Sequence, residues 1–162
     1  MQSVEIVQGL TLLATANTLP VFATKLLGAR FAWPLDVGLT FIDGRPIFGQ
    51  SKTIRGVLLS LLGTAGVASL IGLDAQIGVL SAAVAMFGDL LSSFLKRRMN
   101  LPSGSRAMGL DQLPESLLPL LVLQRTLHLT LVDIVVTAMI FFIGELLLSQ
   151  LFYKLGLRDR PY

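Results

Sequence analysis

The 162-residue sequence contains no cysteine and one histidine, and only 14% of its residues are charged. The lack of cysteine excludes disulfides, thiolate metal sites and a cysteine nucleophile. An average soluble domain has about 25% charged residues, so this chain has too little charge to cover a water-exposed surface. The shortage argues against an ordinary cytosolic enzyme, a disordered chain and a nucleic-acid-binding module.

Apolar residues fill the place that charge leaves: 53% of the chain is hydrophobic and the mean hydropathy is +0.74. A bilayer crossing takes roughly 17–25 predominantly apolar residues. Five segments approach or reach that length, at 4–24, 57–73, 76–95, 113–129 and 134–152, and the fourth is the most interrupted by polar residues and proline. The sequence therefore predicts an all-α, polytopic membrane helix bundle of about five transmembrane helices, forming one domain over residues 1–162.

The basic residues gather in three of the stretches that separate or follow these segments. Twelve of the 13 Lys and Arg residues lie at 25–55, 96–106 and 154–160, and only Arg125 lies elsewhere. Because cytoplasmic loops are rich in Lys and Arg, we expect these three stretches in the cytoplasm. Five crossings then give a multi-pass cell-membrane protein with its N-terminus outside and its C-terminus in the cytoplasm.

The first cytoplasmic loop, about residues 25–56, is too long for a plain connection between helices. The pair Asp43-Gly44 separates two short apolar runs in it, which predicts a hairpin turn. The loop ends at residues 49–56 with the run GQSKTIRG. Small residues let backbone amides approach a phosphate, and Lys52 and Arg55 add positive charge, so this run is a candidate phosphate site.

The second cytoplasmic loop, about residues 96–113, follows an unusual helix end. Asp89 lies about 10 Å inside the helix by the rise per residue, and a carboxylate at that depth is a functional candidate. Asp89, Ser93 and Lys96 are spaced to share one helix face. Asp111 follows in the loop. Two carboxylates beside clustered Lys and Arg suit a metal-bound polyphosphate, in which the metal bridges carboxylate and phosphate oxygens.

Each candidate also has a structural interpretation. Asp89 could be a buried carboxylate paired with Lys96, and Asp111 could cap the N-terminus of the fourth helix. The basic cluster at 96–98 could be a topological anchor. The remaining candidates could contact lipid headgroups or neighbouring helices: Lys52, Arg55 and Asn17.

Taken together, the motifs resemble those of the archaeal CDP-archaeol synthases, distant relatives of the phosphatidate cytidylyltransferases. The resemblance is carried by Asn17 and Pro20 and by the runs at 34–38, 43–49, 52–56, 88–89, 93–98 and 110–112. It covers most of residues 17–112, and the chain length and five-helix plan also fit. After Asp111-Gln112 this chain continues with Leu113-Pro114-Glu115, where the family pattern has an acidic residue and an aromatic.

The resemblance implies a CTP-dependent lipid-phosphate cytidylyltransferase that transfers CMP from CTP to a lipid phosphate in the bilayer, releases pyrophosphate and requires Mg²⁺. It implies Asp89 and Asp111 as catalytic residues and Mg²⁺ ligands, with Lys96 as a third catalytic residue. Expected substrate contacts are the other polar residues of the matched motifs: Asn17, Lys52, Thr53, Arg55, Ser93, Arg97, Arg98 and Gln112. The expected partners are CTP, the lipid phosphate and the bilayer, without nucleic acid.

Two other classes of function fit the hydropathy. A small transporter or channel would also place polar residues among its helices, but the internal repeats typical of transporters are not evident. A non-enzymatic membrane scaffold would not explain small and basic residues gathered beside two carboxylates. The sequence leaves open whether the acceptor is an archaeal ether lipid or a bacterial acyl lipid.

Overall fold

The computed structural model describes residues 3–105, 107 and 109–154 and is built from helices. The elements in chain order are α1 (Ser3–Leu27), α2 (Ile54–Leu70), α3 (Ala75–Arg98), α4 (Gln112–Val122) and α5 (Leu131–Lys154). The predicted all-helical bundle is confirmed. Three of the basic residues on which the predicted orientation rests lie outside the described residues: Arg106, Arg158 and Arg160.

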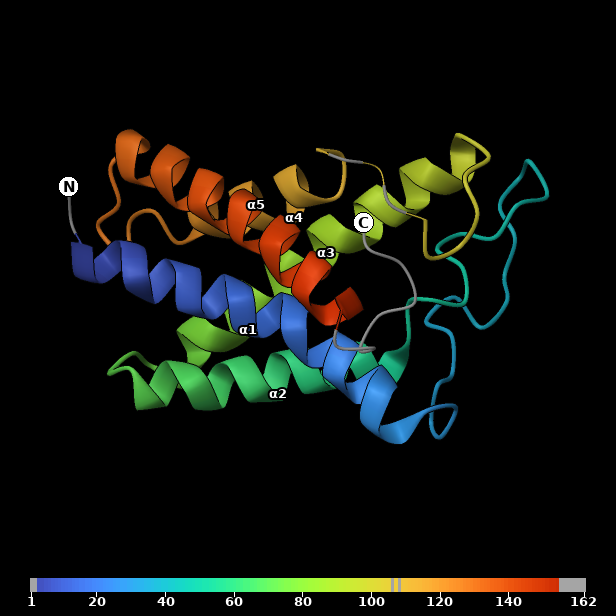
Figure 1. The fold of residues 1–162 in the computed structure, drawn as a ribbon, viewed down its shortest axis with the longest axis horizontal. Coiled ribbons are helices and arrows are strands. Elements are labelled where there is room, and N and C mark those ends of the chain that lie inside the picture. The colour runs from blue at the N-terminus through green and yellow to red at the C-terminus, as the bar shows by residue number, and fades with distance from the viewer. Residues whose placement is uncertain (1–2, 106, 108, 155–162) are drawn as a thin grey trace.

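The helices run alternately up and down the long axis of the molecule (Figure 1). α1, α3 and α5 run toward one end, and α2 and α4 run back from it. The two long connections, 28–53 and 99–111, therefore lie together at that end, on the right of the view. The opposite end holds the short turn between α2 and α3 and the connection from α4 to α5.

Three helices, α1, α3 and α5, are long and apolar enough to cross a membrane, and α2 is a shorter apolar helix of 17 residues. The fourth predicted segment differs from expectation, because α4 is helical for only 11 residues. That is about 16 Å of helix, roughly half of the hydrocarbon core. Residues 123–128 continue from it as turns. Pro119 lies near the end of α4, and the chain leaves helical geometry soon after it.

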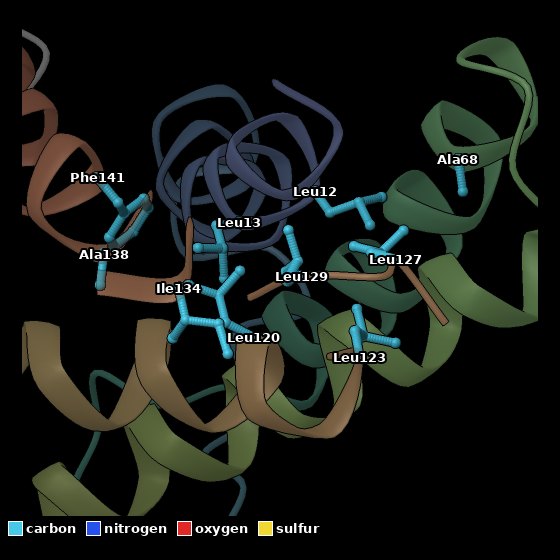
Figure 2. Packing of buried hydrophobic residues seen from close by; sticks show 10 residues of the cluster. All are labelled: Leu12, Leu13, Ala68, Leu120, Leu123, Leu127, Leu129, Ile134, Ala138 and Phe141. Atoms are coloured by element: carbon cyan, nitrogen blue, oxygen red, sulfur yellow. The ribbon is translucent and has the colours of Figure 1, made fainter. Parts of the chain in front are cut away.

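The main hydrophobic core lies where α1 meets α4, α5 and the connection between them (Figure 2). Leu12 and Leu13 of α1 are almost completely buried against side chains from these elements. The cluster also contains Ala68, Leu120, Leu123, Leu127, Leu129, Ile134, Ala138 and Phe141. Leu123, Leu127 and Leu129 lie in the non-helical stretch 123–129 after α4. This stretch is therefore held in place by core packing.

The helices that carry the loops pack closely through small residues. A Cβ atom on Gly78 of α3 would lie 2.4 Å from the carbonyl oxygen of Thr64 in α2. Ser60 of α2 donates a hydrogen bond of 2.9 Å to the carbonyl of Ala16 in α1. Small residues and side-chain hydroxyls stabilise helix pairs where lipid gives no hydrophobic drive for association. These contacts set the spacing of the helix ends from which the loops extend.

We predict that Gly78→Ala destabilises the bundle, because the added methyl group meets backbone atoms of α2 and forces the helices apart. The expected loss is about 1–3 kcal/mol, seen as a lower thermal unfolding temperature in detergent. Gly66→Ala in α2 is the matched control, since its Cβ would meet nothing within 4 Å. Equal unfolding temperatures for the two variants would contradict the close-packing argument.

Candidate active site

The first loop folds back along its own start, and this places Lys52. The amide of Leu35 donates to the carbonyl of Lys52 at 2.8 Å, and the amide of Ile54 donates to the carbonyl of Trp33 at 3.1 Å. The predicted hairpin is confirmed as a tight turn around Gly44, with Thr40 and Pro46 bridged across it. The loop thus presents Lys52 at the beginning of α2.

Lys52 contacts Asp89 of α3. Its Nζ atom lies 2.5 Å from each carboxylate oxygen, so one ammonium bridges both oxygens. The two side chains are 22% and 19% exposed, which leaves this pair accessible at the edge of the bundle. Lys96 is therefore not the partner of Asp89, and the structural interpretation that pairs these two residues within one helix is wrong. The actual pair joins the first loop to the third helix.

A shallow groove of about 50 Å³ lies beside this ion pair. Lys52 and Asp89 form its polar part with hydroxyl groups from the loop and from α1, and the rest is apolar. The lining residues are Pro20, Thr24, Ser51, Lys52, Thr53, Gly56, Val57, Met86, Asp89 and Leu90. The groove therefore joins a charged end to apolar residues of three helices, α1, α2 and α3.

The second carboxylate, Asp111, pairs with Lys96. The Nζ atom of Lys96 lies 2.6 Å from Oδ1 of Asp111 and donates to the carbonyl of Ser105 at 2.8 Å. The other oxygen of Asp111 accepts a hydrogen bond of 3.0 Å from the amide of Ala107. Asp111 stands at the cap position of α4, but its side chain makes no capping hydrogen bond. The helix-cap interpretation of Asp111 is therefore wrong, because its carboxylate faces Lys96 and its own loop.

The second loop and the start of α4 pack against one face of α3. This face contains Gly88, Ser92 and Lys96, which are spaced four residues apart. A Cβ on Gly88 would lie 2.5 Å from the carbonyl oxygen of Pro114, so only glycine allows α4 to start here. The hydroxyl of Ser92 lies 2.6 Å from the carbonyl oxygen of Leu110, next to Asp111. The sequence-based assignment chose Ser93 and missed Ser92. The spacing of Gly88 and Ser92 on a shared face was the available signal.

Arg98 binds the hairpin of the first loop. It forms an ion pair of 2.9 Å with Asp43 and donates to the carbonyl of Pro46 at 2.6 Å. Its guanidinium lies 4.8 Å from the ring centres of both Phe41 and Phe94. Arg45, which the sequence did not single out, donates in return to the carbonyl of Arg98 at 2.7 Å. These contacts hold the hairpin against the end of α3.

Two other arginines are buried and keep nitrogen atoms without a hydrogen-bond partner among the described residues. Arg97 is 4% exposed and donates through Nη2 to the carbonyl of Pro102 at 2.7 Å, while Nε and Nη1 have no partner. Arg55 donates to the carbonyls of Gly28 and Arg30 at the end of α1, while Nε and Nη2 have none. Both guanidinium groups therefore keep unused donors near the loops.

Three further predicted residues make local contacts. Thr53 caps α2, since its hydroxyl accepts a hydrogen bond of 3.1 Å from the amide of Gly56, and it also lines the groove. Gln112 accepts a hydrogen bond of 2.9 Å from the amide of Gly109 and orders the second loop. Asn17 donates to the carbonyl of Leu13 within α1, one turn before the groove. Ser93 is buried on α3, with 2% of its surface exposed.

The carboxylates of the site are suited to a divalent cation only when substrate phosphates complete its ligands. Among the described residues, no group of three or more His, Asp or Glu could hold a metal ion. Mg²⁺, however, is commonly bound by one or two carboxylates together with substrate phosphates. Asp89 and Asp111 each already hold a cationic ammonium group at 2.5–2.6 Å. The donor set therefore fits a cation that arrives with a polyphosphate.

Comparison with known proteins identifies the family. Residues 6–162 match the family described as "CarS-like: CDP-archaeol synthase". The chain belongs to the CDP-archaeol synthase family. A CDP-archaeol synthase of Pyrobaculum calidifontis is 40% identical over 156 residues, covering 91% of this chain and 90% of that protein. One of Pyrococcus furiosus is 44% identical over 111 residues, or 60% of each chain.

A solved structure confirms the architecture of this CDP-archaeol synthase family member. It is described as an "intramembrane enzyme for archaeal membrane lipids biosynthesis". It shares 27% sequence identity, with a TM-score of 0.70 over 85% of this chain and 90% of the other. Together with the apolar helices, this makes the protein a multi-pass membrane protein.

In this member of the CDP-archaeol synthase family, the departure after Gln112 places a carboxyl group inside the bundle. Glu115 is 6% exposed, and its carboxyl group lies near that of Glu145 in α5. These two side chains thus lie between α4 and α5 inside the bundle.

We predict that Arg98→Lys loosens the hairpin, since lysine keeps the charge but loses the planar guanidinium that lies over two aromatic rings. Limited chymotrypsin digestion in detergent should cleave after Phe41 several-fold faster than in the unmodified protein. Arg125→Lys, at an exposed position near the other end, is the control. Unchanged cleavage at Phe41 in Arg98→Lys would show that the stacked arginine does not hold the hairpin.

Proposed function

We propose that this protein is a membrane cytidylyltransferase that transfers CMP from CTP to a lipid phosphate, forming a CDP-activated lipid and pyrophosphate. The observation that carries the proposal is the pair of lysine–carboxylate contacts, Lys52–Asp89 and Lys96–Asp111, at one end of the bundle. Cations and carboxylates at one membrane face suit a metal-bound triphosphate. Membership of the CDP-archaeol synthase family and the structural neighbour support the same reaction.

The site faces the cytoplasm in this proposal, because both loops carry the excess of Lys and Arg. The N-terminus then lies outside and the C-terminus inside. CTP reaches the loops from the cytosol, while the lipid phosphate stays in the bilayer. The groove beside Lys52 has the corresponding composition, polar at the ion pair and apolar along α1, α2 and α3. The acceptor therefore approaches sideways between these helices.

Asp89 and Asp111 are the proposed Mg²⁺ ligands. When bound, Mg²⁺ neutralises charge on the triphosphate and orients it. Lys52 and Lys96, which hold the two carboxylates in the absence of substrate, are placed to bind phosphate oxygens. The guanidinium groups of Arg97 and Arg55, which keep unused donors, add positive charge near the loops.

The reaction needs no nucleophilic side chain. A phosphate monoester oxygen of the lipid attacks the α-phosphorus of CTP, the bond to the β-phosphate oxygen breaks, and pyrophosphate leaves. The protein contributes position and charge stabilisation, which is how phosphoryl-transfer enzymes obtain most of their rate. The names of the archaeal relatives favour an archaeol-type lipid phosphate as the acceptor.

We predict that Asp89→Asn and Asp111→Asn each lower the rate of CDP-lipid formation by about 10²-fold or more while the protein stays folded. The amide removes the negative charge without changing side-chain size. Product is measured with labelled CTP, Mg²⁺ and the lipid phosphate in detergent. Asp74→Asn, at the exposed N-terminal cap of α3, is the matched control and should retain full activity. Near-normal rates in both site variants would refute the two-carboxylate site.

We predict that pyrophosphate release requires a lipid phosphate, CTP and Mg²⁺ together. Purified protein in vesicles is incubated with a panel of ether- and acyl-linked lipid phosphates, with and without EDTA. Release with one lipid class identifies the acceptor, and loss of release with EDTA supports the metal requirement. A transporter or scaffold would release no pyrophosphate with any lipid in the panel.

A further inference from the structure

Asp36 lies in the first loop, does not line the groove, belongs to neither lysine–carboxylate pair and is 5% exposed. Its carboxylate accepts three backbone hydrogen bonds. Oδ1 accepts from the amide of Gly38 at 3.1 Å, and Oδ2 accepts from the amides of Phe48 and Gly49 at 2.9 Å and 2.8 Å. One buried side chain thus joins two parts of the loop that are 12–13 residues apart.

The residues that Asp36 holds lead directly to Lys52. Gly49 accepts a hydrogen bond of 3.2 Å from the amide of Lys52 through its carbonyl, which closes the turn that carries the lysine. The amide of Gly49 is at the same time bound by Asp36. A displaced Gly49 would therefore move the backbone of Lys52, and with it the ammonium group that contacts Asp89.

The same turn contacts the second loop. Gly49 has φ +90°, and a Cβ there would lie 2.8 Å from the hydroxyl of Ser103, so the turn fits closely against this residue. The amide of Ser51 donates to the Ser103 hydroxyl at 3.2 Å, and the two serine hydroxyls are also 3.2 Å apart. Through these contacts the 49–52 turn joins the first loop to the second.

We infer that Asp36 is a positioning residue for the reaction: its carboxylate holds the 49–52 turn so that Lys52 and Ser51 meet α3 and the second loop. The inference rests on the proposed function, because it assigns Lys52 to the substrate site. Burial raises the pKa of Asp36, but the three amide donors outweigh it and hold the pKa below its usual value. The group is therefore an anion at neutral pH, and an anionic acceptor strengthens each of the three bonds.

The decisive variant is Asp36→Asn, which keeps the size of the side chain but has only one acceptor oxygen. Since both carboxylate oxygens accept amide hydrogen bonds, at least one amide loses its partner. Asp74→Asn is again the matched control, because asparagine caps a helix as well as aspartate does.

The position of the turn is measured without reference to activity. The chain has no cysteine, so the double substitution Ser51→Cys and Ser103→Cys introduces the only thiols. Their oxygen atoms are 3.2 Å apart, which suits disulfide formation with little backbone movement. We expect mild oxidation to form the disulfide about tenfold more slowly when Asp36→Asn is added, and at an unchanged rate when Asp74→Asn is added.

The kinetic readout is kcat/KM for CTP, measured in otherwise unmodified protein. We expect Asp36→Asn to lower kcat/KM for CTP about tenfold, while the thermal unfolding temperature of the helix bundle changes little. An unchanged disulfide rate would overturn the inference, and so would an unchanged kcat/KM alongside a slower disulfide rate. If the unmodified protein formed no CDP-lipid, the proposed function would fail while the disulfide comparison still tested what Asp36 holds.

Discussion

The two loops depend on ion pairs that join the carboxylates of the candidate site to lysines. A charged group in an apolar environment is costly unless an opposite charge or several hydrogen bonds compensate it. Lys52 with Asp89 and Lys96 with Asp111 meet this requirement by joining loops to α3. The same contacts gather two carboxylates and two ammonium groups at one end of the bundle. The pairing that stabilises the loops is therefore also what assembles the candidate site.

α3 is the helix on which both loops converge. It contributes Asp89 to the contact with the first loop, and Gly88, Ser92 and Lys96 to the contacts with the second loop and the start of α4. Its last residue, Arg98, holds the hairpin through an ion pair and two aromatic rings. Small residues on its other faces allow α2 to lie close. A site at the membrane surface thus obtains rigidity from a helix that is fixed by its neighbours inside the bilayer.

The sequence predicted the helices and the two loops, and it did not predict the contacts that join distant positions. Lys52 and Asp89 are 37 residues apart, so their pairing followed from no local spacing. The alternative interpretation that paired Asp89 with Lys96 rested on helix periodicity, which describes one helix and not its neighbours. The contacts of Asp36 could not be predicted for the same reason, because its three amide partners come together only once the loop is folded.

By itself the sequence determined the membrane class, the order of the helices and the gathering of basic residues in two loops. These properties follow from hydropathy and charge along the chain, which act on each segment separately. The tertiary structure decided which cation meets which carboxylate, where α4 ends, and which groups keep unused donors. Those outcomes depend on the spacing between packed helices, and that spacing is set by many side chains together.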